Sequence, residues 1–374
     1  MARVLFTSCP AYGHLLPMLP LIRAASRAGH QVRVATGPDL VDALATRGVP
    51  AHPVGPPWAA SWSVHEAIWA DPAGSEEGKM LAGAVALFGA PALARLTDLS
   101  VMARQWHPDL VVHEVLEMAG PLLSRRLTVP AVVHGFGPMF PSYAELIGPV
   151  GDAIGEAGLW GLVAAEQALD ICPPALQPDG PRPWPRAVPL RPTAGEPGPL
   201  PPRVAAALRK TAPLAYFTLG TVKNDTTDLA TALAALADYD GTVVAATGRA
   251  LRRHELGPVP ANVVLAQFVP QTHLLERAEL LVSHCGSGTM LGALVHGVPQ
   301  VALPRGTDQP QNAALLARAG AGVIVAPQDY AIDTIRAALA RVTGEPGYRT
   351  RAGHLREQIT RMPDADTVWA HLQA

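Results

Sequence analysis

The stretch VSHCGSGTMLGALVHGVPQVALPRGTDQPQN combines a histidine, a glycine-containing turn and an acid–amide pair. His284 ends a predicted strand, and Gly286 and Gly288 allow the backbone to approach a ligand closely. Ser287 and Thr289 are suitable N-cap residues for the apolar helix that follows. Because a helix N-terminus offers unpaired N–H groups and a partial positive charge, the turn predicts a phosphate or diphosphate site. An ordinary capped turn with a histidine in the core is the alternative.

The acid–amide pair, Asp308 and Gln309, follows the next predicted strand, residues 299–304. A carboxylate accepts hydrogen bonds and a carboxamide both donates and accepts them, so the pair suits neighbouring sugar hydroxyls. A single pair of this kind in a loop carries little information. Beside a diphosphate turn at the end of the adjacent strand, it predicts binding of a phosphosugar.

Two other motifs with similar spacing do not fit this turn. The dinucleotide fingerprint GxGxxG needs glycine where Leu291 stands, which disfavours an NAD-dependent oxidoreductase. The hydrolase elbow GxSxG needs glycine at the positions of Cys285 and Thr289. Neighbouring residues of a strand point to opposite faces, so Cys285 is not expected to form a nucleophile–base pair with His284.

A second histidine, His14, lies in PAYGHLLP, directly after the first predicted strand at residues 3–8. At the carboxyl end of a parallel strand, such a side chain is expected to face a ligand crevice. An imidazole titrates near neutral pH and can accept a proton from an acceptor hydroxyl. His14 is therefore the expected general base, and a histidine held by packing at a helix N-terminus is the alternative.

Three tryptophans, Trp58, Trp62 and Trp69, lie in the segment PVGPPWAASWSVHEAIWADPAGSEEGKM. We expect an aromatic, loop-rich segment that covers an apolar acceptor, with packing beneath a long loop as the alternative. His113 and His134 end two neighbouring strand patterns. Placement in the core or at the rim is favoured for both, and His134 is the candidate to line the acceptor pocket.

The composition excludes several classes of protein. The chain has 374 residues, 49% of them hydrophobic and 16% charged, which suffices for two domains with buried cores. A net charge of −2 argues against a nucleic-acid-binding or anionic-membrane surface. The cysteines, Cys9, Cys172 and Cys285, indicate neither a disulfide framework nor a metal site. Since no signal-like or transmembrane-length apolar run is evident, we expect a soluble cytoplasmic protein with no membrane partner.

Patterns of buried strands alternate with helical patterns along the chain. RVLFTS and QVRVAT flank an amphipathic helix, and LVVH and AVVHGF continue this first series. LAYFTL begins a second series, which continues with TVVAAT, NVVLAQF, LLVSH and PQVALP. Apolar strands that alternate with helices indicate parallel sheets. The predicted fold class is α/β, with two Rossmann-like doubly wound domains that face a central cleft.

A proline-rich segment at residues 173–202 separates the two series and is expected to be a linker. The expected domains are residues 1–195 and residues 203–356. A C-terminal helix at residues 357–374 is a candidate to pack back on the first domain.

Residues 262–322 resemble the donor-binding signature of GT-B glycosyltransferases of family 1. In particular, they resemble bacterial antibiotic and macrolide glycosyltransferases, which use nucleotide-activated sugars. The matching elements are FVPQTHLL, HCGSGT, the helix ending HGVPQ, LPRGTDQPQNA and the turn at 320–322. Their order and spacing hold across the whole stretch, and GHLLP near the N-terminus extends the similarity. The resemblance implies the GT-B fold, with an acceptor-binding first domain and a donor-binding second domain.

The resemblance assigns roles to residues of the second domain. A phosphate-binding histidine, a diphosphate turn and two readers of sugar hydroxyls match motif positions, and a valine lies where the family places the nucleotide base. A threonine in the TLGT turn lies where the family places a hydroxyl near phosphate. The implied donor-binding residues are Thr221, Val269, His284, Gly286, Ser287, Gly288, Thr289, Asp308 and Gln309.

The resemblance also implies a catalytic histidine in a GHxxP motif, which is His14 here. In PDLVVHE, Glu114 occupies the place of an acid that orients this histidine, where many relatives have aspartate. The implied reaction is inverting transfer of a deoxysugar from a nucleoside diphosphate, expected to be dTDP, to a hydrophobic natural-product aglycone in antibiotic biosynthesis. No cofactor or metal is expected, because the helix dipole and His284 would neutralise the leaving diphosphate.

Two DxD sequences, Asp238-Tyr239-Asp240 and Asp364-Ala365-Asp366, match the metal motif of the other major glycosyltransferase fold. Their turn-rich contexts favour solvated surface instead. Two further functions stay open, namely a non-hydrolysing nucleotide-sugar epimerase and a catalytically silent nucleotide-sugar-binding partner of another transferase. A homodimer is also left open.

Overall fold

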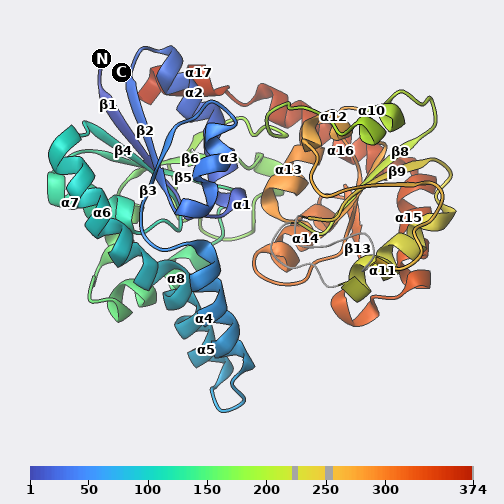
Figure 1. Ribbon diagram of the computed structural model, residues 1–374, viewed down its shortest axis with the longest axis horizontal. Coiled ribbons are helices and arrows are strands. Elements are labelled where there is room, and N and C mark those ends of the chain that lie inside the picture. Colours follow the sequence, from blue (N-terminus) through green and yellow to red (C-terminus); the bar gives the residue numbers. More distant parts are fainter. Residues whose placement is uncertain (221–225, 249–255, 373–374) are drawn as a thin grey trace. The chain divides into compact units, whose positions relative to one another are not determined.

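The computed structural model describes residues 1–220, 226–248 and 256–372, and the chain divides into two α/β units (Figure 1). Unit 1 consists of Met1–Ile171, Pro178–Leu190 and Pro363–Ala374, and unit 2 of Cys172–Gln177 and Arg191–Met362. The proline-rich segment therefore contributes to both units, and the end of the chain belongs to unit 1.

Unit 1 contains a seven-stranded sheet of parallel pairs in the order β3-β2-β1-β4-β5-β6-β7. Its strands are β1 (Arg3–Thr7), β2 (Gln31–Thr36), β3 (Ala51–Pro53), β4 (Leu110–Glu114), β5 (Ala131–His134), β6 (Gln167–Asp170) and β7 (Val188–Pro189). Chain order reverses between β1 and β4, and open α/β sheets bind ligands beside such a switch point. Val4, Leu5 and Phe6 of β1 are fully buried on both faces, which explains the continuous apolar run in its sequence.

Helices of unit 1 connect these strands and supply the rest of its interior (Figure 1). They are α1 (Tyr12–Leu15), α2 (Leu19–Arg27), α3 (Val41–Ala45), α4 (Trp58–Ala70), α5 (Glu76–Ala84), α6 (Ala90–Trp106), α7 (Ala119–Leu127), α8 (Ser142–Ala153), α9 (Leu159–Ala164) and α17 (Ala365–Leu372).

The segment that contains three tryptophans forms α4 and α5, which extend beyond the sheet as a helical pair (Figure 1). The prediction of a loop-rich segment is therefore wrong. Trp58, Trp62, His65 and Trp69 follow one another at spacings of four, three and four residues, which places them along one face of a helix. The flanking prolines and glycines indicate loops, but the helical period of the aromatic residues prevails.

One helical run of unit 1, Glu76–Trp106, is long and apolar enough to cross a membrane. It joins α5, a π-helical turn at Val85–Gly89 and α6. The prediction that the chain has no transmembrane-length run is therefore wrong. A core helix meets the same criteria, and 44% of the apolar window is buried within the structure. Arg95 of α6 is fully buried and pairs with Glu117, so this part of the run lies in the interior of unit 1.

Helix α17 packs on the first strand and the second helix of unit 1. The ring of Trp369 lies 6.4 Å from that of Phe6 and 5.3 Å from that of His30, measured between centroids. Arg27 of α2 makes an ion pair of 2.7 Å with Asp366. The last helix thus completes unit 1 by covering β1.

Unit 2 contains a six-stranded parallel sheet in the order β10-β9-β8-β11-β12-β13. Its strands are β8 (Leu214–Thr218), β9 (Thr242–Ala246), β10 (Val263–Ala266), β11 (Leu280–Ser283), β12 (Gln300–Ala302) and β13 (Gly322–Ile324). The switch point here lies between β8 and β11. The two units therefore share one topology, as the α/β prediction requires.

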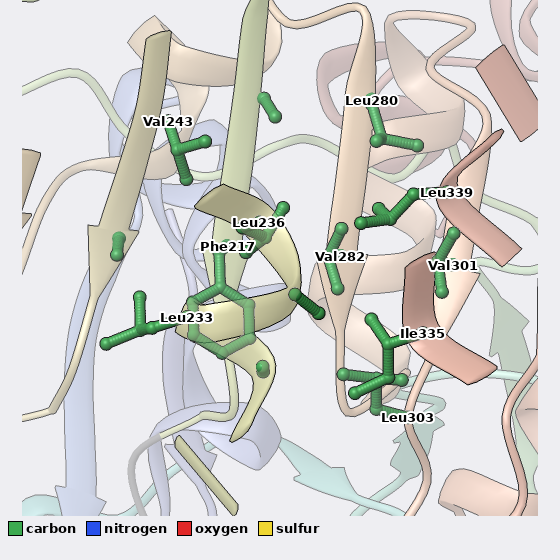
Figure 2. Close-up of a cluster of buried hydrophobic side chains, with 14 of the residues drawn as sticks. Phe217, Leu233, Leu236, Val243, Leu280, Val282, Val301, Leu303, Ile335 and Leu339 are labelled. Atoms are coloured by element: carbon green, nitrogen blue, oxygen red, sulfur yellow. The ribbon is translucent and has the colours of Figure 1, made fainter. Parts of the chain in front are cut away.

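The helices of unit 2 cover both faces of its sheet. They are α10 (Pro202–Leu208), α11 (Thr226–Ala235), α12 (Gln271–Leu275), α13 (Ser287–Val295), α14 (Gln309–Arg318), α15 (Ile332–Gly344) and α16 (Pro346–Arg361). Phe217 and Val282 belong to a buried apolar cluster on one face of the sheet, which also contains Ile335 of α15 (Figure 2). Tyr216 and Leu281 point to the other face and a second apolar cluster, because side chains alternate along a strand.

Candidate active site

Functional side chains gather at the switch point of each sheet. His14 follows β1, and Glu114 is the last residue of β4. In unit 2, Gly220 follows β8 and His284 follows β11. The connections that follow the two adjacent strands of a switch point run to opposite sides of it, so a crevice in which a ligand can bind lies beyond the carboxyl ends of these strands.

His14 and Glu114 form a dyad in unit 1. Nδ1 of His14 lies 3.0 Å from Oε2 of Glu114, and the side chains are 15% and 0% exposed. Oε1 of Glu114 accepts a hydrogen bond of 2.8 Å from the Leu116 N–H. Burial alone would raise the pKa of Glu114, but His14 and the Leu116 N–H outweigh burial and lower the pKa. An ionised Glu114 favours a proton on Nδ1 of His14, which leaves Nε2 as the nitrogen that can accept a proton.

A second buried pair, Arg95 and Glu117, lies beneath the dyad. Nε of Arg95 donates to Oε1 of Glu117 over 2.7 Å, and Oε2 accepts hydrogen bonds from Thr7 and the Gly120 N–H. Nη2 of Arg95 lies 3.8 Å from Sγ of Cys9. This pair was not predicted, because a single charged residue in an apolar helical run belongs to no motif.

Cys9, His14 and Glu114 are the one group in the described ranges with metal-ligand spacing, since their ligand atoms lie within 4.8 Å of one another. Burial and the Glu114 carboxylate raise the pKa of Cys9 well above its usual value. A protonated thiol is a poor metal ligand, and the Arg95 guanidinium beside it opposes a cation. The trio is therefore better suited to proton transfer than to metal binding.

Aromatic rings surround His14. Its ring centroid lies 4.5 Å from that of Phe136, 6.2 Å from Phe88 and 6.3 Å from Trp58. Trp62 stacks on Trp58 at 6.1 Å and continues this aromatic row along α4. Phe88 and Phe136 were missed, because neither belongs to a motif; the place of Phe136 just after β5 was the available signal.

The three tryptophans predicted to bind the acceptor lie along α4 at increasing distance from the dyad. Trp58 contacts His14, Trp62 contacts Trp58, and Trp69 lies at the far end of α4, where it is 44% exposed. Trp69 reaches the row only through His65, at 6.2 Å. An apolar molecule beside His14 would therefore meet Trp58 and Phe136 first.

His134 and His113 lie in the sheet next to the dyad. His134 is the register partner of Glu114 and is fully buried, so its side chain has no exposed surface for an acceptor. Burial lowers the pKa of His134 to about 4, although Nδ1 bonds the Gly135 carbonyl at 2.6 Å. Nε2 of His113 bonds Glu166 at 2.5 Å, and this carboxylate raises the pKa of His113 against the effect of burial.

His284 lies between two glycines of unit 2. A Cβ atom added at Gly286 would come within 2.5 Å of Nε2 of His284, and one added at Gly220 within 2.8 Å. Both positions therefore require glycine to leave room for the imidazole, a reason different from the predicted backbone approach to a ligand. Burial lowers the pKa of His284, so the ring is a neutral donor.

Helix α13 begins at Ser287 with Gly286 as its N-cap, and no side chain caps it. The prediction that Ser287 or Thr289 caps the helix is wrong, because Gly286 is the N-cap and both residues lie within the helix. The Ser287 hydroxyl donates to Asp308 at 2.7 Å. The first N–H groups of a helix have no partner within it, so this turn offers them to an anion. A Cβ added at Gly288 would meet no atom within 4 Å, which leaves open space in front of the turn.

The loop after β12 holds Asp308 and Gln309 beside this turn. Oδ2 of Asp308 accepts hydrogen bonds from Ser287 and from Nδ2 of Asn312, at 2.7 and 2.8 Å. Oε1 of Gln309 accepts a hydrogen bond of 2.8 Å from the Arg305 N–H. The structure thus brings together the two halves of the sequence stretch. Asn312 was missed, although its place four residues after Asp308 on a helix predicts their contact.

The remaining predicted donor residues give less information. Val269 is buried in the core of unit 2, so its backbone rather than its side chain is available to a ligand. Thr221 lies outside the described residues. Asp238 and Asp366 are exposed and pair with arginines, at 2.7 Å each, which confirms that both DxD sequences are surface features.

Comparisons with known proteins agree with this division into two units. Two family models match the chain, described as erythromycin biosynthesis protein CIII-like, N-terminal domain (residues 23–184) and C-terminal domain (residues 230–374). L-demethylnoviosyl transferase of Streptomyces niveus is 32% identical, covering 100% of this chain and 98% of the relative. Tylactone mycaminosyltransferase of Streptomyces fradiae is 30% identical, covering 96% of this chain and 89% of the relative.

Solved structures with the same fold cover the whole chain. Spinosyn rhamnosyltransferase SpnG has a TM-score of 0.81 and 27% identity, and each chain is covered completely. It has also been solved with thymidine diphosphate and with spinosyn aglycone. Glycosyltransferase SnogD from Streptomyces nogalater has a TM-score of 0.78 and 28% identity, covering 100% of this chain and 98% of SnogD.

Proposed function

Because the chain belongs to the erythromycin biosynthesis protein CIII-like family of glycosyltransferases, we propose that it transfers a deoxysugar from thymidine diphosphate to a hydrophobic natural-product acceptor, with inversion at the anomeric carbon. The names of the relatives support a deoxysugar, and the thymidine diphosphate complex of SpnG supports the nucleotide. The aglycone complex of SpnG supports a hydrophobic acceptor. We also propose that the reaction takes place in the cytoplasm.

The observation that carries the proposal is the pairing of His14 with the buried Glu114 at the switch point of unit 1. Nε2 of His14 takes the proton of the acceptor hydroxyl while its oxygen attacks the anomeric carbon. The bond from that carbon to the diphosphate oxygen breaks, and thymidine diphosphate leaves with the electron pair. Glu114 holds the ring and stabilises the imidazolium that forms. General-base catalysis of this kind contributes about 10²–10⁴-fold.

In unit 2, the leaving diphosphate binds at the N-terminus of α13. The backbone N–H groups that begin with Ser287 and Gly288 donate to it, and neutral His284 adds a hydrogen bond. Asp308 and Gln309 receive the sugar hydroxyls, and Thr289, Val269 and Thr221 complete the donor site as the family motif implies. Helix dipole and hydrogen bonds stabilise the departing charge, so the proposed reaction uses no metal.

The acceptor binds beside His14 against the rings of Trp58 and Phe136. Trp62 extends this surface along α4, and Trp69 is exposed at its end. His134 is fully buried, so we do not place it in contact with the acceptor.

The test is to incubate the protein with thymidine diphosphate sugars and a panel of aromatic and macrolactone aglycones. Release of thymidine diphosphate that requires an aglycone, with a product of inverted anomeric configuration by NMR, supports the proposal. Conversion of the donor without any aglycone indicates an epimerase. Binding of thymidine diphosphate without turnover of any aglycone indicates a silent partner protein.

A further inference from the structure

The turn in front of α13 contains a residue in a disfavoured backbone conformation. Cys285 has a φ of +62°, in the left-handed region that residues other than glycine rarely adopt. Its side chain is fully buried, and its N–H donates to Oγ of Ser283 over 3.1 Å. This conformation turns the chain from β11 into the first N–H groups of the helix. Contacts from elsewhere must therefore hold it.

Asn312 of α14 supplies these contacts. Its side chain is fully buried, and Nδ2 lies 3.1 Å from the Cys285 carbonyl oxygen, 3.0 Å from Oγ of Ser287 and 2.8 Å from Oδ2 of Asp308. Ser287 in turn donates to Asp308 at 2.7 Å. One amide group thus joins the carbonyl of the strained residue, the first residue of α13 and the acid of the sugar-binding loop.

We propose that Asn312 is a positioning residue of the donor site, an inference that rests on the proposed function. It holds Cys285 in the left-handed conformation, so that the N–H groups of α13 point toward the diphosphate. It also fixes Asp308 for the sugar. Asn312 itself does not touch the donor, and its effect passes through Cys285 and Asp308. The rival explanation is that Asn312 only fills space in the core of unit 2.

Gln300 offers a matched control for this rival explanation. Like Asn312, it is a fully buried amide of unit 2, and its Nε2 donates to the α13 backbone at the Met290 carbonyl over 3.1 Å. In both residues the side-chain oxygen has no partner in the part of the chain that the structure describes. Replacing Gln300 therefore removes a comparable buried amide without touching the turn.

Cys285 provides a second, sharper control. Glycine adopts a φ of +62° readily, so Cys285→Gly holds the turn without help from Asn312. Alanine pays the same conformational penalty as cysteine, so Cys285→Ala removes the thiol but leaves the turn dependent on Asn312. If Asn312 acts through the turn, Gly at 285 rescues its loss and Ala does not.

The experiment measures the Kd of thymidine diphosphate by calorimetry and the melting temperature for the wild type, N312A, Q300A, C285G, C285G/N312A and C285A/N312A. N312A is expected to weaken binding about tenfold, the effect of losing one buried hydrogen-bond donor. In turnover assays of N312A with varied concentrations of the sugar donor, the KM of the donor rises by a similar factor and kcat changes little. Q300A keeps wild-type affinity, C285G/N312A regains most of the loss and C285A/N312A regains none. If N312A does not fold, N312S takes its place.

Affinity of N312A equal to that of the wild type, or equal rescue by glycine and alanine at 285, overturns the inference. A loss of affinity in Q300A as large as that in N312A also overturns it. Failure of the wild type itself to bind thymidine diphosphate is a different result, which overturns the proposed function and with it the basis of the inference.

Discussion

His14 and His284 each follow the carboxyl end of a strand at the switch point of a sheet, His14 after β1 and His284 after β11, which is the counterpart of β4. Their surroundings differ. His14 has a buried carboxylate 3.0 Å from Nδ1 and aromatic rings around it. His284 lies between Gly220 and Gly286, and burial lowers its pKa. One fold thus holds an imidazole that can accept a proton and another that stays neutral and donates a hydrogen bond.

The difference teaches that the groups around a histidine decide its chemistry, since both rings lie beside a switch point. The sheet of unit 1 repeats the rule beside the dyad. His113 is bonded to Glu166 and its pKa is raised, whereas His134 is bonded to a carbonyl and its pKa is lowered to about 4. His113 and His134 are both fully buried, so burial alone does not separate them.

The largest expected effect is on the proton-accepting histidine. His14→Ala should lower kcat by about 10²–10⁴-fold, because the general base is lost. The Kd of thymidine diphosphate should stay unchanged, since His14 belongs to unit 1. His284→Ala is the matched variant and should weaken binding of thymidine diphosphate instead. A His14→Ala enzyme with near-normal kcat, or with weakened nucleotide binding, would contradict the comparison.

The second prediction tests the rule through stability. The folded pKa of His134, about 4, lies below the ordinary value of 6.5, so folding favours the neutral ring. Its contribution is complete above pH 6.5 and is lost as the pH falls toward 4, by about 3 kcal/mol in total. For His113 the pKa is raised, so its contribution is complete below pH 6.5 and is lost as the pH rises through the folded value.

Urea unfolding between pH 4 and 8 measures these slopes. All seven tryptophans lie in unit 1, so their fluorescence follows that unit. The difference in unfolding free energy between the wild type and His134→Gln should shrink as the pH falls. The difference for His113→Gln should shrink as the pH rises. If the difference changes with pH in the same direction for both variants, the Glu166 carboxylate does not decide whether His113 is charged.

A somewhat smaller effect is expected for the carboxylate of the dyad. Glu114→Gln keeps the shape of the side chain and removes the charge that stabilises the His14 imidazolium. We expect kcat to fall by about 10²-fold, which is the lower end of the range expected for His14→Ala. Glu117→Gln is the control, because it removes a nearby buried charge that does not contact His14. The melting temperatures of both variants are measured alongside kcat. Equal loss of kcat in both variants would argue for a general effect on unit 1.

Much of this arrangement could be predicted from the sequence, for reasons that differ between the sites. The donor turn is local, so His284, Ser287 and Asp308 appear together in one stretch, and parallel strands bring their ends to one edge. The dyad joins residues 14 and 114, and periodicity alone contains no signal for that pair. Glu114 came only from the resemblance to a family motif.

What could not be predicted depends on side-chain packing. The Arg95–Glu117 pair and the rings of Phe88 and Phe136 are set by how helices lie on the sheet, which no local pattern encodes. The helix α4 could have been predicted from the spacing of its tryptophans. The Ser287 cap was a reasonable prediction, but the helix already begins at Ser287, and the Ser287 hydroxyl donates to the Asp308 carboxylate.

The smallest expected effect concerns the glycine beside His284. In Gly286→Ala, the added Cβ would lie 2.5 Å from Nε2 of His284, closer than non-bonded atoms approach, so the imidazole must move. We expect the Kd of thymidine diphosphate to rise about tenfold, equivalent to about 1.4 kcal/mol.

Gly288→Ala is the comparison, because its Cβ meets no protein atom within 4 Å and can disturb only the ligand. In a His284→Ala background, the effect of Gly286→Ala should disappear, whereas any effect of Gly288→Ala should persist, because only the former acts through the imidazole. If the effects of Gly286→Ala and His284→Ala are additive, Gly286 acts through the backbone conformation and not through the imidazole of His284. The contrast between His284 and His14 would then lose the hydrogen bond from His284 on which it depends.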